Sequence, residues 1–231
     1  MALSLAQDPA ADAVLSSEPF VLLVGMLLDQ QVPMERAFGG ATRLHDRLRE
    51  HGGLEPGKVA DLDPEGLTEI CATPPAVHRF PAAMARRIHA LGAYVRDHYG
   101  GDTTAVWRDA TDGADLRRRL QELPGFGEQK ARIFTALLGK QLSVCPPGWR
   151  EAAGGYGEQG SHRSVADVVD AESLARVRAY KEQKRQSTGR RGPDGRSGRA
   201  RVYDRQVRGT LGHCALDSSL ACCARPPVRE R

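Results

Sequence analysis

Apolar residues recur at helical spacing along most of this sequence, and this spacing constrains the fold more than any other feature. The clearest series steps by four, three, four and four through Met84, Ile88, Leu91, Val95 and Tyr99. The glycine pair at 100–101 follows it and is typical of a helix end. Convincing alternation of apolar and polar residues, which is the pattern of a half-buried strand, is missing. The sequence therefore predicts an all-α domain, which we place at residues 1–184.

The longest apolar run, Phe20–Leu28, is apolar on every side and predicts a buried helix. Ser16 and Ser17 precede the run, and we expect them to cap this helix. The run is too short to span a bilayer, and Asp29 follows it directly. No Lys or Arg comes before Arg36, so the pattern of a secretory signal is missing as well. We expect a protein that is not secreted and has no membrane partner.

The composition changes near residue 185. Beyond it Arg, Gly and Ser alternate without an apolar period, as in the stretch STGRRGPDGRSGRAR. Residues 181–231 hold 13 Lys and Arg against 5 Asp and Glu, a net charge of +8, which leaves 20 basic and 24 acidic residues before them. Such a segment cannot bury enough apolar surface to offset its ordering entropy. We expect residues 185–231 to be a disordered basic tail, so the overall charge does not identify the domain as a nucleic-acid binder.

The cysteines are spaced irregularly, at Cys71, Cys145, Cys214, Cys222 and Cys223. No CxxC pair is present, so neither a zinc ribbon nor an iron–sulfur loop has its ligand frame. His213 lies beside the last three cysteines, and together they are residue types that hold metals. Reduced thiols in a cytosolic protein are the simpler interpretation, and we expect no metal site.

Residues 123–131, with the sequence LPGFGEQKA, join two helical patterns through a Pro-Gly-apolar-Gly turn. We place this pair of helices at about residues 114–139. Gly125 and Gly127 let the backbone turn tightly and leave N–H groups uncovered at the start of the second helix, where they can bind a phosphate. Ala131 is small enough to pack between the helices. The alternative is a plain αα-hairpin in which the glycines only make the turn.

The whole pattern resembles the helix-hairpin-helix of the endonuclease III-like (HhH-GPD) superfamily of DNA glycosylases. Residues 19–31 are similar to the core helix of this family, which ends in a Gln that enters the DNA stack. Residues 84–101 are similar to the helix that precedes the hairpin, so the resemblance covers about residues 13–145.

The resemblance implies a two-lobed helical fold that binds double-stranded DNA across the cleft between its lobes. Chemistry on a base inside a duplex requires the nucleotide to be flipped out, and a side chain must fill the gap that it leaves. A monovalent cation shared between the hairpin and the DNA is the one ion that the resemblance suggests. The DNA-binding residues implied by the resemblance are Gln31, which would fill the gap, and Gly125, Phe126, Gly127 and Lys130.

The first departure from the family concerns its nucleophile. Bifunctional members carry a Lys just after the hairpin, which forms a Schiff base with the sugar and cuts the strand. That position is Gln129 here, and Lys130 follows one residue later, a rotation of about 100° on a helix. An amide cannot be the nucleophile, so the resemblance implies a monofunctional glycosylase in which water attacks the sugar. Unless the register of the hairpin slips, we expect Lys130 to face a phosphate or solvent.

The second departure concerns a carboxylate. The Asp that in this family stabilises the developing oxocarbenium ion and helps to activate water has no counterpart, because residues 129–150 contain no Asp or Glu. Losing this charge would remove an electrostatic contribution of several kcal/mol. Glu151 is the best substitute because it is closest to the hairpin helix. The next acids are Glu158, Asp167 and Asp170, which we expect to be surface or capping residues.

Two functions therefore stay open. One is a monofunctional DNA N-glycosylase that removes a damaged or mismatched base, with His78, Arg79, Phe80 and Trp149 as candidates to contact that base. The other is a helix-hairpin-helix protein that binds DNA or scaffolds repair without catalysis. Gln31 favours the first, since base flipping has little use without chemistry, and the missing Asp favours the second. Either protein would be a monomer in the cytoplasm, associated with the nucleoid, with no cofactor and no iron–sulfur cluster.

Overall fold

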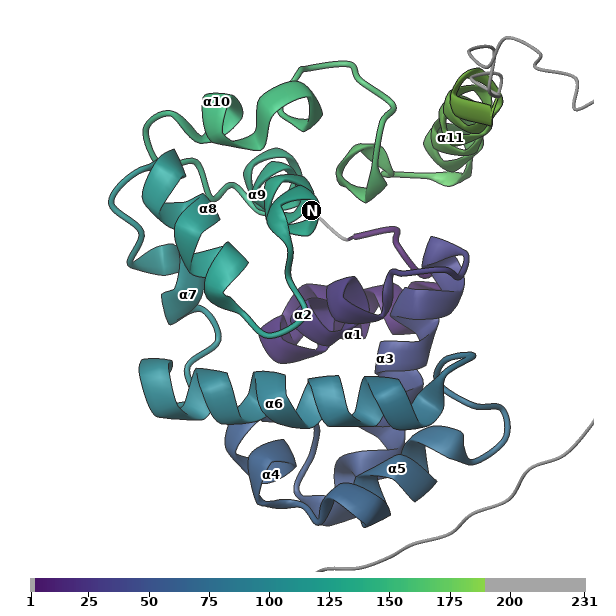
Figure 1. The fold of residues 1–231 in the computed structure, drawn as a ribbon, viewed down its shortest axis with the longest axis vertical. Coiled ribbons are helices and arrows are strands. Elements are labelled where there is room, and N and C mark those ends of the chain that lie inside the picture. Colours follow the sequence, from purple (N-terminus) through teal and green to yellow (C-terminus); the bar gives the residue numbers. More distant parts are fainter. Residues whose placement is uncertain (1–2, 190–231) are drawn as a thin grey trace, which may run out of the picture. The chain divides into compact units, whose positions relative to one another are not determined.

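Within the described residues, 3–189, every regular element of the computed structural model is a helix (Figure 1). This confirms the predicted all-α class. In chain order the elements are α1 (Pro9–Ser17), α2 (Pro19–Leu28), α3 (Met34–Leu48), η1 (Arg49–His51), α4 (Pro56–Asp61), α5 (Pro64–Ala72), α6 (Pro81–Tyr99), α7 (Ala105–Arg108), α8 (Gly113–Glu122), α9 (Glu128–Gln141), α10 (Trp149–Ala153), η2 (Gly154–Tyr156), η3 (Val165–Asp167) and α11 (Ala171–Gly189).

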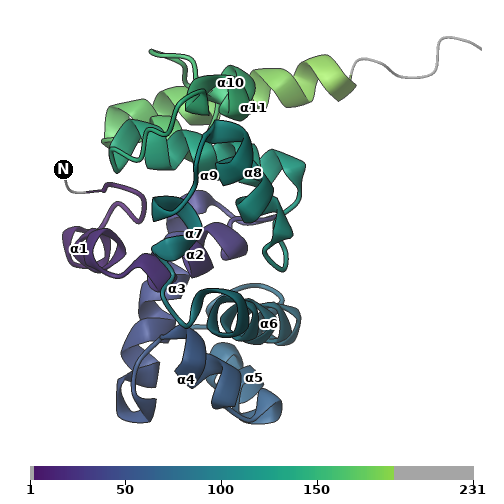
Figure 2. The same ribbon diagram turned by 90° about the vertical axis from the view of Figure 1, so that its left-hand side faces the viewer.

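The helices form two lobes. In the first, α2 packs on α3, and α6 packs on both α4 and α5. In the second, α8, α9 and α10 pack on one another, and η3 lies against both α9 and α11. In the turned view of Figure 2, α2 lies between the α4–α6 layer and the α8–α9 hairpin. The two-lobed arrangement that the resemblance implied is therefore present.

The central helix α2 is buried along its whole apolar run, since every residue from Phe20 to Leu28 is inaccessible to solvent. The expectation that Ser16 and Ser17 cap it is wrong, because both residues end the preceding helix α1. Glu18 stands at the cap of α2 without a side-chain hydrogen bond. Pro19 explains the difference, since a proline in the first turn removes one of the N–H groups that a cap would satisfy.

Cap geometry fixes other helix boundaries, among them the predicted stop at residues 100–101. The carboxylate of Asp63 accepts a hydrogen bond of 2.9 Å from the backbone N–H of Gly66, which fixes the start of α5. Gly100 ends α6 in the left-handed conformation, at φ 62°. The hairpin helices α8 and α9 lie where residues 114–139 were predicted to form them.

The last helix runs further than expected. α11 continues through Gly189, so residues 185–189, which we assigned to the tail, are helical. The rest of the expected tail, with His213 and its neighbouring cysteines, lies outside the described residues. Within residues 3–189 no single helix is long and apolar enough to cross a membrane, although α1 and α2 pass such a test together as a pair bent by 115°.

Candidate DNA-binding cleft

The hairpin turn between α8 and α9 places its two glycines in different environments. Gly125 adopts a left-handed conformation at φ +83°, and a Cβ atom there would lie 2.4 Å from Cδ1 of Leu27 on α2. Gly127 has an ordinary extended backbone at φ −83°, is exposed, and would place a Cβ in open space. It precedes α9 without any side-chain cap, so the N–H groups of the first turn point outward uncovered. These groups are free to bind an anion.

Phe126, between the two glycines, does not face outward. Its side chain is only 4% exposed and packs edge-on against Phe134 of α9, with ring centroids 6.1 Å apart. Ala131 is fully buried in the same contact, as predicted. The side chain of Phe126 therefore anchors the turn on the core, and this residue can contact DNA only through its backbone.

A cleft of about 1240 Å³ opens beside the hairpin. Its walls come from five parts of the chain: the end of α2 with the start of α3, Arg79 before α6, the first turns of α9, the segment 156–165, and α11. A volume of this size is enough for a flipped nucleotide, since small-molecule pockets measure about 300–1,000 Å³. Its polar lining includes Asp29, Gln31, Glu35, Gln129, Lys130, Tyr156 and Lys181.

Gln31 lies at the edge of this cleft, directly beyond the central helix. Its side chain is exposed, and its backbone is left-handed at φ 58°, which is uncommon for a residue other than glycine. The preceding residue, Gln30, is fixed by two contacts. Its backbone carbonyl lies 3.0 Å from Nε2 of His78, and the oxygen of its side-chain amide accepts a hydrogen bond of 2.6 Å from Arg87. These contacts fix the backbone next to Gln31, while its own side chain stays exposed at the cleft.

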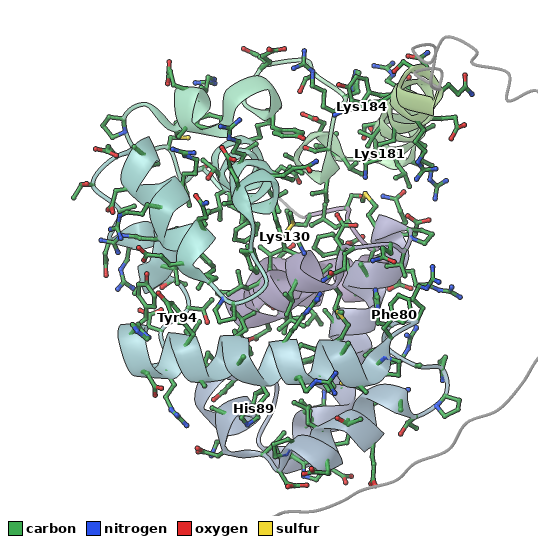
Figure 3. All side chains as sticks on the ribbon, viewed as in Figure 1. Phe80, His89, Tyr94, Lys130, Lys181 and Lys184 are labelled. Carbon is green, nitrogen blue, oxygen red and sulfur yellow. The ribbon has the colours of Figure 1, made fainter. Side chains whose placement is uncertain are left out.

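Lys130 is half-buried and lies in the wall of the cleft, and its expected contact with a phosphate or solvent stays a prediction. Its ammonium points into the cleft and donates a hydrogen bond of 2.8 Å to the carbonyl of Leu27, near the end of α2 (Figure 3). The physical reason is that the last carbonyls of a helix lack partners, so α2 offers an acceptor to the face of α9 that carries Lys130. Burial lowers the pKa of this lysine to about 8, the Asp29 carboxylate opposing that shift.

Asp29 is a cleft residue that sequence reasoning missed. It follows the last residue of α2, and burial raises the pKa of its carboxyl above the ordinary range. Lys181 of α11 and Lys130 of α9 act in the opposite direction, and Glu35 of α3 adds to the rise. A signal was present, since an acid directly after a wholly apolar helix must lie near the core. The family's Asp follows the hairpin in sequence, whereas Asp29 precedes it.

Gln129, which occupies the position of the family lysine, also lines the cleft. Its side-chain amide donates a hydrogen bond of 3.1 Å to the hydroxyl of Tyr156. The amide and the phenol together form a polar wall with an aromatic ring, and such a wall can contact a base or a sugar.

Glu151, the predicted substitute for the missing Asp, is not brought together with Gln129 and Lys130. It lines a separate depression with Asp112, Arg117 and Arg132, on the other side of α9. Glu158, further along the chain, forms an ion pair of 2.8 Å with Arg163.

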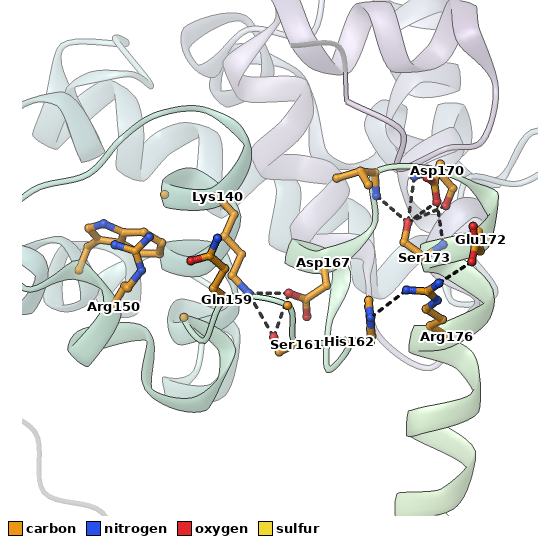
Figure 4. A pocket seen from close by; sticks show the side chains of 15 residues that line it. Lys140, Arg150, Gln159, Ser161, His162, Asp167, Asp170, Glu172, Ser173 and Arg176 are labelled. Atoms are coloured by element: carbon orange, nitrogen blue, oxygen red, sulfur yellow. Dashed lines mark hydrogen bonds and ion pairs between the residues drawn. The ribbon is translucent and has the colours of Figure 1, made fainter.

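The two remaining acids after the hairpin have structural roles. Asp167 is buried, accepts hydrogen bonds of 2.5 Å from Lys140 and 3.0 Å from Ser161, and closes the capping box of η3 (Figure 4). Asp170 accepts a hydrogen bond of 2.7 Å from the backbone N–H of Ser173 and caps α11. Both are capping residues, as predicted.

The four candidates for base contact differ in their exposure to solvent. Trp149 is 5% exposed and stacks so closely on Gly139 that a Cβ there would lie 2.5 Å from its ring, so it is a packing residue. His78 is buried and supports Gln30, as described above. Arg79 lines the cleft and lies over the ring of Phe80, whose side chain is 42% exposed. Of these four candidates, Arg79 and Phe80 are the accessible ones.

No group of three or more His, Cys, Asp or Glu side chains gathers in a metal-binding arrangement among residues 3–189. In the same range Cys71 and Cys145 are free thiols, the first buried and the second exposed. The absence of a cofactor stays a prediction.

Comparison with known families gives one match. A family model described as "HhH-GPD superfamily base excision DNA repair protein" matches residues 24–191, which is more than half of the chain. These residues include the end of α2, the hairpin and the whole lining of the cleft. The chain matches none of the curated proteins and none of the solved structures.

Proposed function

The chain belongs to the HhH-GPD superfamily of base excision DNA repair proteins, and on this premise we propose that it is a monofunctional DNA N-glycosylase. The superfamily implies a glycosylase-type function on DNA. The proposed substrate is double-stranded DNA with one damaged or mismatched base, bound by a monomer without a cofactor. The proposed compartment is the cytoplasm, where the nucleoid lies.

The cleft is the observation that carries this proposal. Three features meet in this cleft between the lobes. They are the uncovered N–H groups of the hairpin, the exposed Gln31, and a partly buried polar lining. A protein that only held DNA would need the hairpin. It would not need an opening of about 1240 Å³ lined by buried charged groups next to a residue suited to fill the DNA stack.

Water is the proposed nucleophile because Gln129 has no amine to form a Schiff base. One observation favours a second candidate, a bifunctional enzyme that also cuts the strand. Lys130 lies in the cleft with a pKa of about 8, so a useful fraction of its amine is neutral near physiological pH. Its hydrogen bond to Leu27 argues against this role, since it would have to break before the nitrogen could reach a sugar.

The repair-scaffold alternative rests on a different observation, the loop after α9 that has lost its acid. It predicts tight DNA binding and no base release from any duplex. The two classes of function are therefore separated by a single measurement of product.

The test uses duplexes that each carry one uracil, hypoxanthine, 8-oxoguanine or 3-methyladenine, incubated with excess protein. Base release followed by strand scission only after alkali is the expected result. Scission without alkali, together with a covalent adduct trapped by borohydride, would show the bifunctional enzyme, and Lys130→Ala should then abolish the adduct. Binding to these duplexes without release of any base would establish the scaffold instead.

A further inference from the structure

A glycosylase needs a negative charge near the sugar, because positive charge develops on the sugar ring as the bond to the base breaks. The lysines of this cleft make such a negative charge more important. Lys130 and Lys181 both project into the cleft, so a cationic sugar there would be repelled unless an anion stood close to it. Glu151, Glu158, Asp167 and Asp170, the acids nearest to the hairpin in the sequence after it, do not supply that anion, since none of the four lines the cleft.

Among the described residues that line the cleft, the acids are Asp29, Glu35 and Glu182. Glu35 is held in an ion pair with Arg178, which joins α3 to α11. Glu182 is exposed on α11 and lies 3.5 Å from Arg185. Asp29 is half-buried, as Glu35 is, but its carboxylate is not paired with an arginine as those of Glu35 and Glu182 are. It is within the electrostatic reach of Lys130, which binds the Leu27 carbonyl near the same helix end.

From this arrangement we propose that Asp29 supplies the catalytic carboxylate of the cleft, in place of the family's missing loop Asp. The inference rests on the proposed glycosylase function. Asp29 stands two residues before Gln31, so the side chain that fills the gap and the carboxylate that faces the extruded sugar come from one end of α2.

In the proposed step the bond between C1′ and the base nitrogen breaks, and its electron pair leaves with the base. The oxygen of a water molecule forms the new bond to C1′. The Asp29 carboxylate accepts the proton that this water loses and then passes it to the departed base, so the net reaction is hydrolysis. In this proposal the negative charge of the Asp29 carboxylate also stabilises the positive charge that develops on the sugar ring.

The pH profile provides a first readout. The groups that face Asp29 are Lys130 on α9, Lys181 on α11 and Glu35 on α3. Burial, the largest effect, raises the pKa of Asp29, so its ionised form is lost early as the pH falls. Base release by the wild-type protein should therefore decrease on the acid side. That limb should disappear in Asp29→Asn, along with a decrease in rate of about 100-fold or more at neutral pH.

The decisive experiment does not depend on knowing the damaged base. Binding is measured to two duplexes, one with a neutral tetrahydrofuran abasic analogue and one with a cationic pyrrolidine analogue that mimics the charged sugar. The wild-type protein should prefer the cation by at least about fivefold, the factor for unit charges about 4 Å apart in bulk water. Asp29→Asn should lose this preference and keep its affinity for the neutral analogue.

Two further variants complete the comparison. Glu182→Gln removes a charge of the same sign from the exposed wall of the cleft and should keep the preference. Glu35→Gln tests the rival carboxylate. An Asp29→Asn protein that keeps the cation preference, or a Glu35→Gln protein that alone loses it, would overturn the assignment. If the wild-type protein releases no base from any duplex, the glycosylase proposal fails, whereas an Asp29-dependent preference would still support the position of the carboxylate at the sugar.

Discussion

Replacing Gly127 by valine should separate DNA binding from folding, because a side chain at this position points into open space. A Cβ at this position meets no atom within 4 Å, and the backbone at φ −83° suits any residue. The free energy of unfolding should therefore change by less than about 1 kcal/mol. The new side chain instead occupies the space in front of the uncovered N–H groups at the start of α9, where we expect a DNA phosphate.

The expected change in Kd follows from the hydrogen bond that the phosphate loses. A hydrogen bond to a charged group contributes about 1.5–3 kcal/mol, so displacing the phosphate from one such bond should raise the Kd by about 10- to 150-fold. The loss should be equal for all DNA sequences, because phosphate contacts carry no sequence information. The dependence of Kd on salt should stay unchanged, since no cationic side chain is removed.

Fluorescence anisotropy with an undamaged duplex over a range of salt concentrations measures both quantities, and thermal unfolding followed by circular dichroism checks the fold. Gly57→Val on α4 is the matched control, because its Cβ also meets open space but lies in the other lobe. Gly125→Ala is expected to lose stability instead, owing to its left-handed backbone and its contact with Leu27. A folded Gly127→Val protein with wild-type affinity would refute the phosphate site at the hairpin.

Three other predictions follow from the structure and the sequence. Lys140→Met should lower the free energy of unfolding by about 3 kcal/mol in urea titrations, because it leaves the carboxylate of Asp167 buried without its cation; wild-type stability would contradict this. Mass spectrometry after brief alkylation of the native protein should find Cys145 modified and Cys71 intact, since burial raises the pKa of the Cys71 thiol to about 12. Deleting residues 192–231, which hold eight Arg and four acidic residues, should flatten the dependence of DNA affinity on salt; an unchanged slope would leave this segment without a role in binding.

Local patterns predicted the helices well, because each depended on neighbours in the sequence. The series from Met84 to Tyr99 and the stop at Gly100 required only helical spacing and a glycine. The apolar run of α2 correctly predicted burial on all sides. The capping role of Asp170 was also a local inference, which the hydrogen bond from Ser173 confirms.

The site was harder to predict, because its residues meet only through packing between lobes. A rotation of about 100° separates Lys130 from Gln129 on α9, but the sequence does not show that both residues line one cleft, or that Lys130 reaches the Leu27 carbonyl. Glu151 was chosen for its closeness in sequence, and it lies elsewhere. Asp29 has no local signal as a functional group, because its environment depends on Lys130 of α9 and Lys181 of α11, which lie far along the chain.

Leu27 connects the hairpin turn to the end of α2 that carries Gln31. Its side chain abuts the hairpin turn at Gly125, and its carbonyl is bound by Lys130, so the turn and the helix end that carries Gln31 cannot move independently. If the hairpin binds a phosphate and Gln31 enters the DNA stack, as proposed, the distance between these two contacts is fixed by the protein. A damaged base whose backbone is displaced by an adjacent one-nucleotide bulge should therefore escape the protein, even though the base itself would fit the cleft.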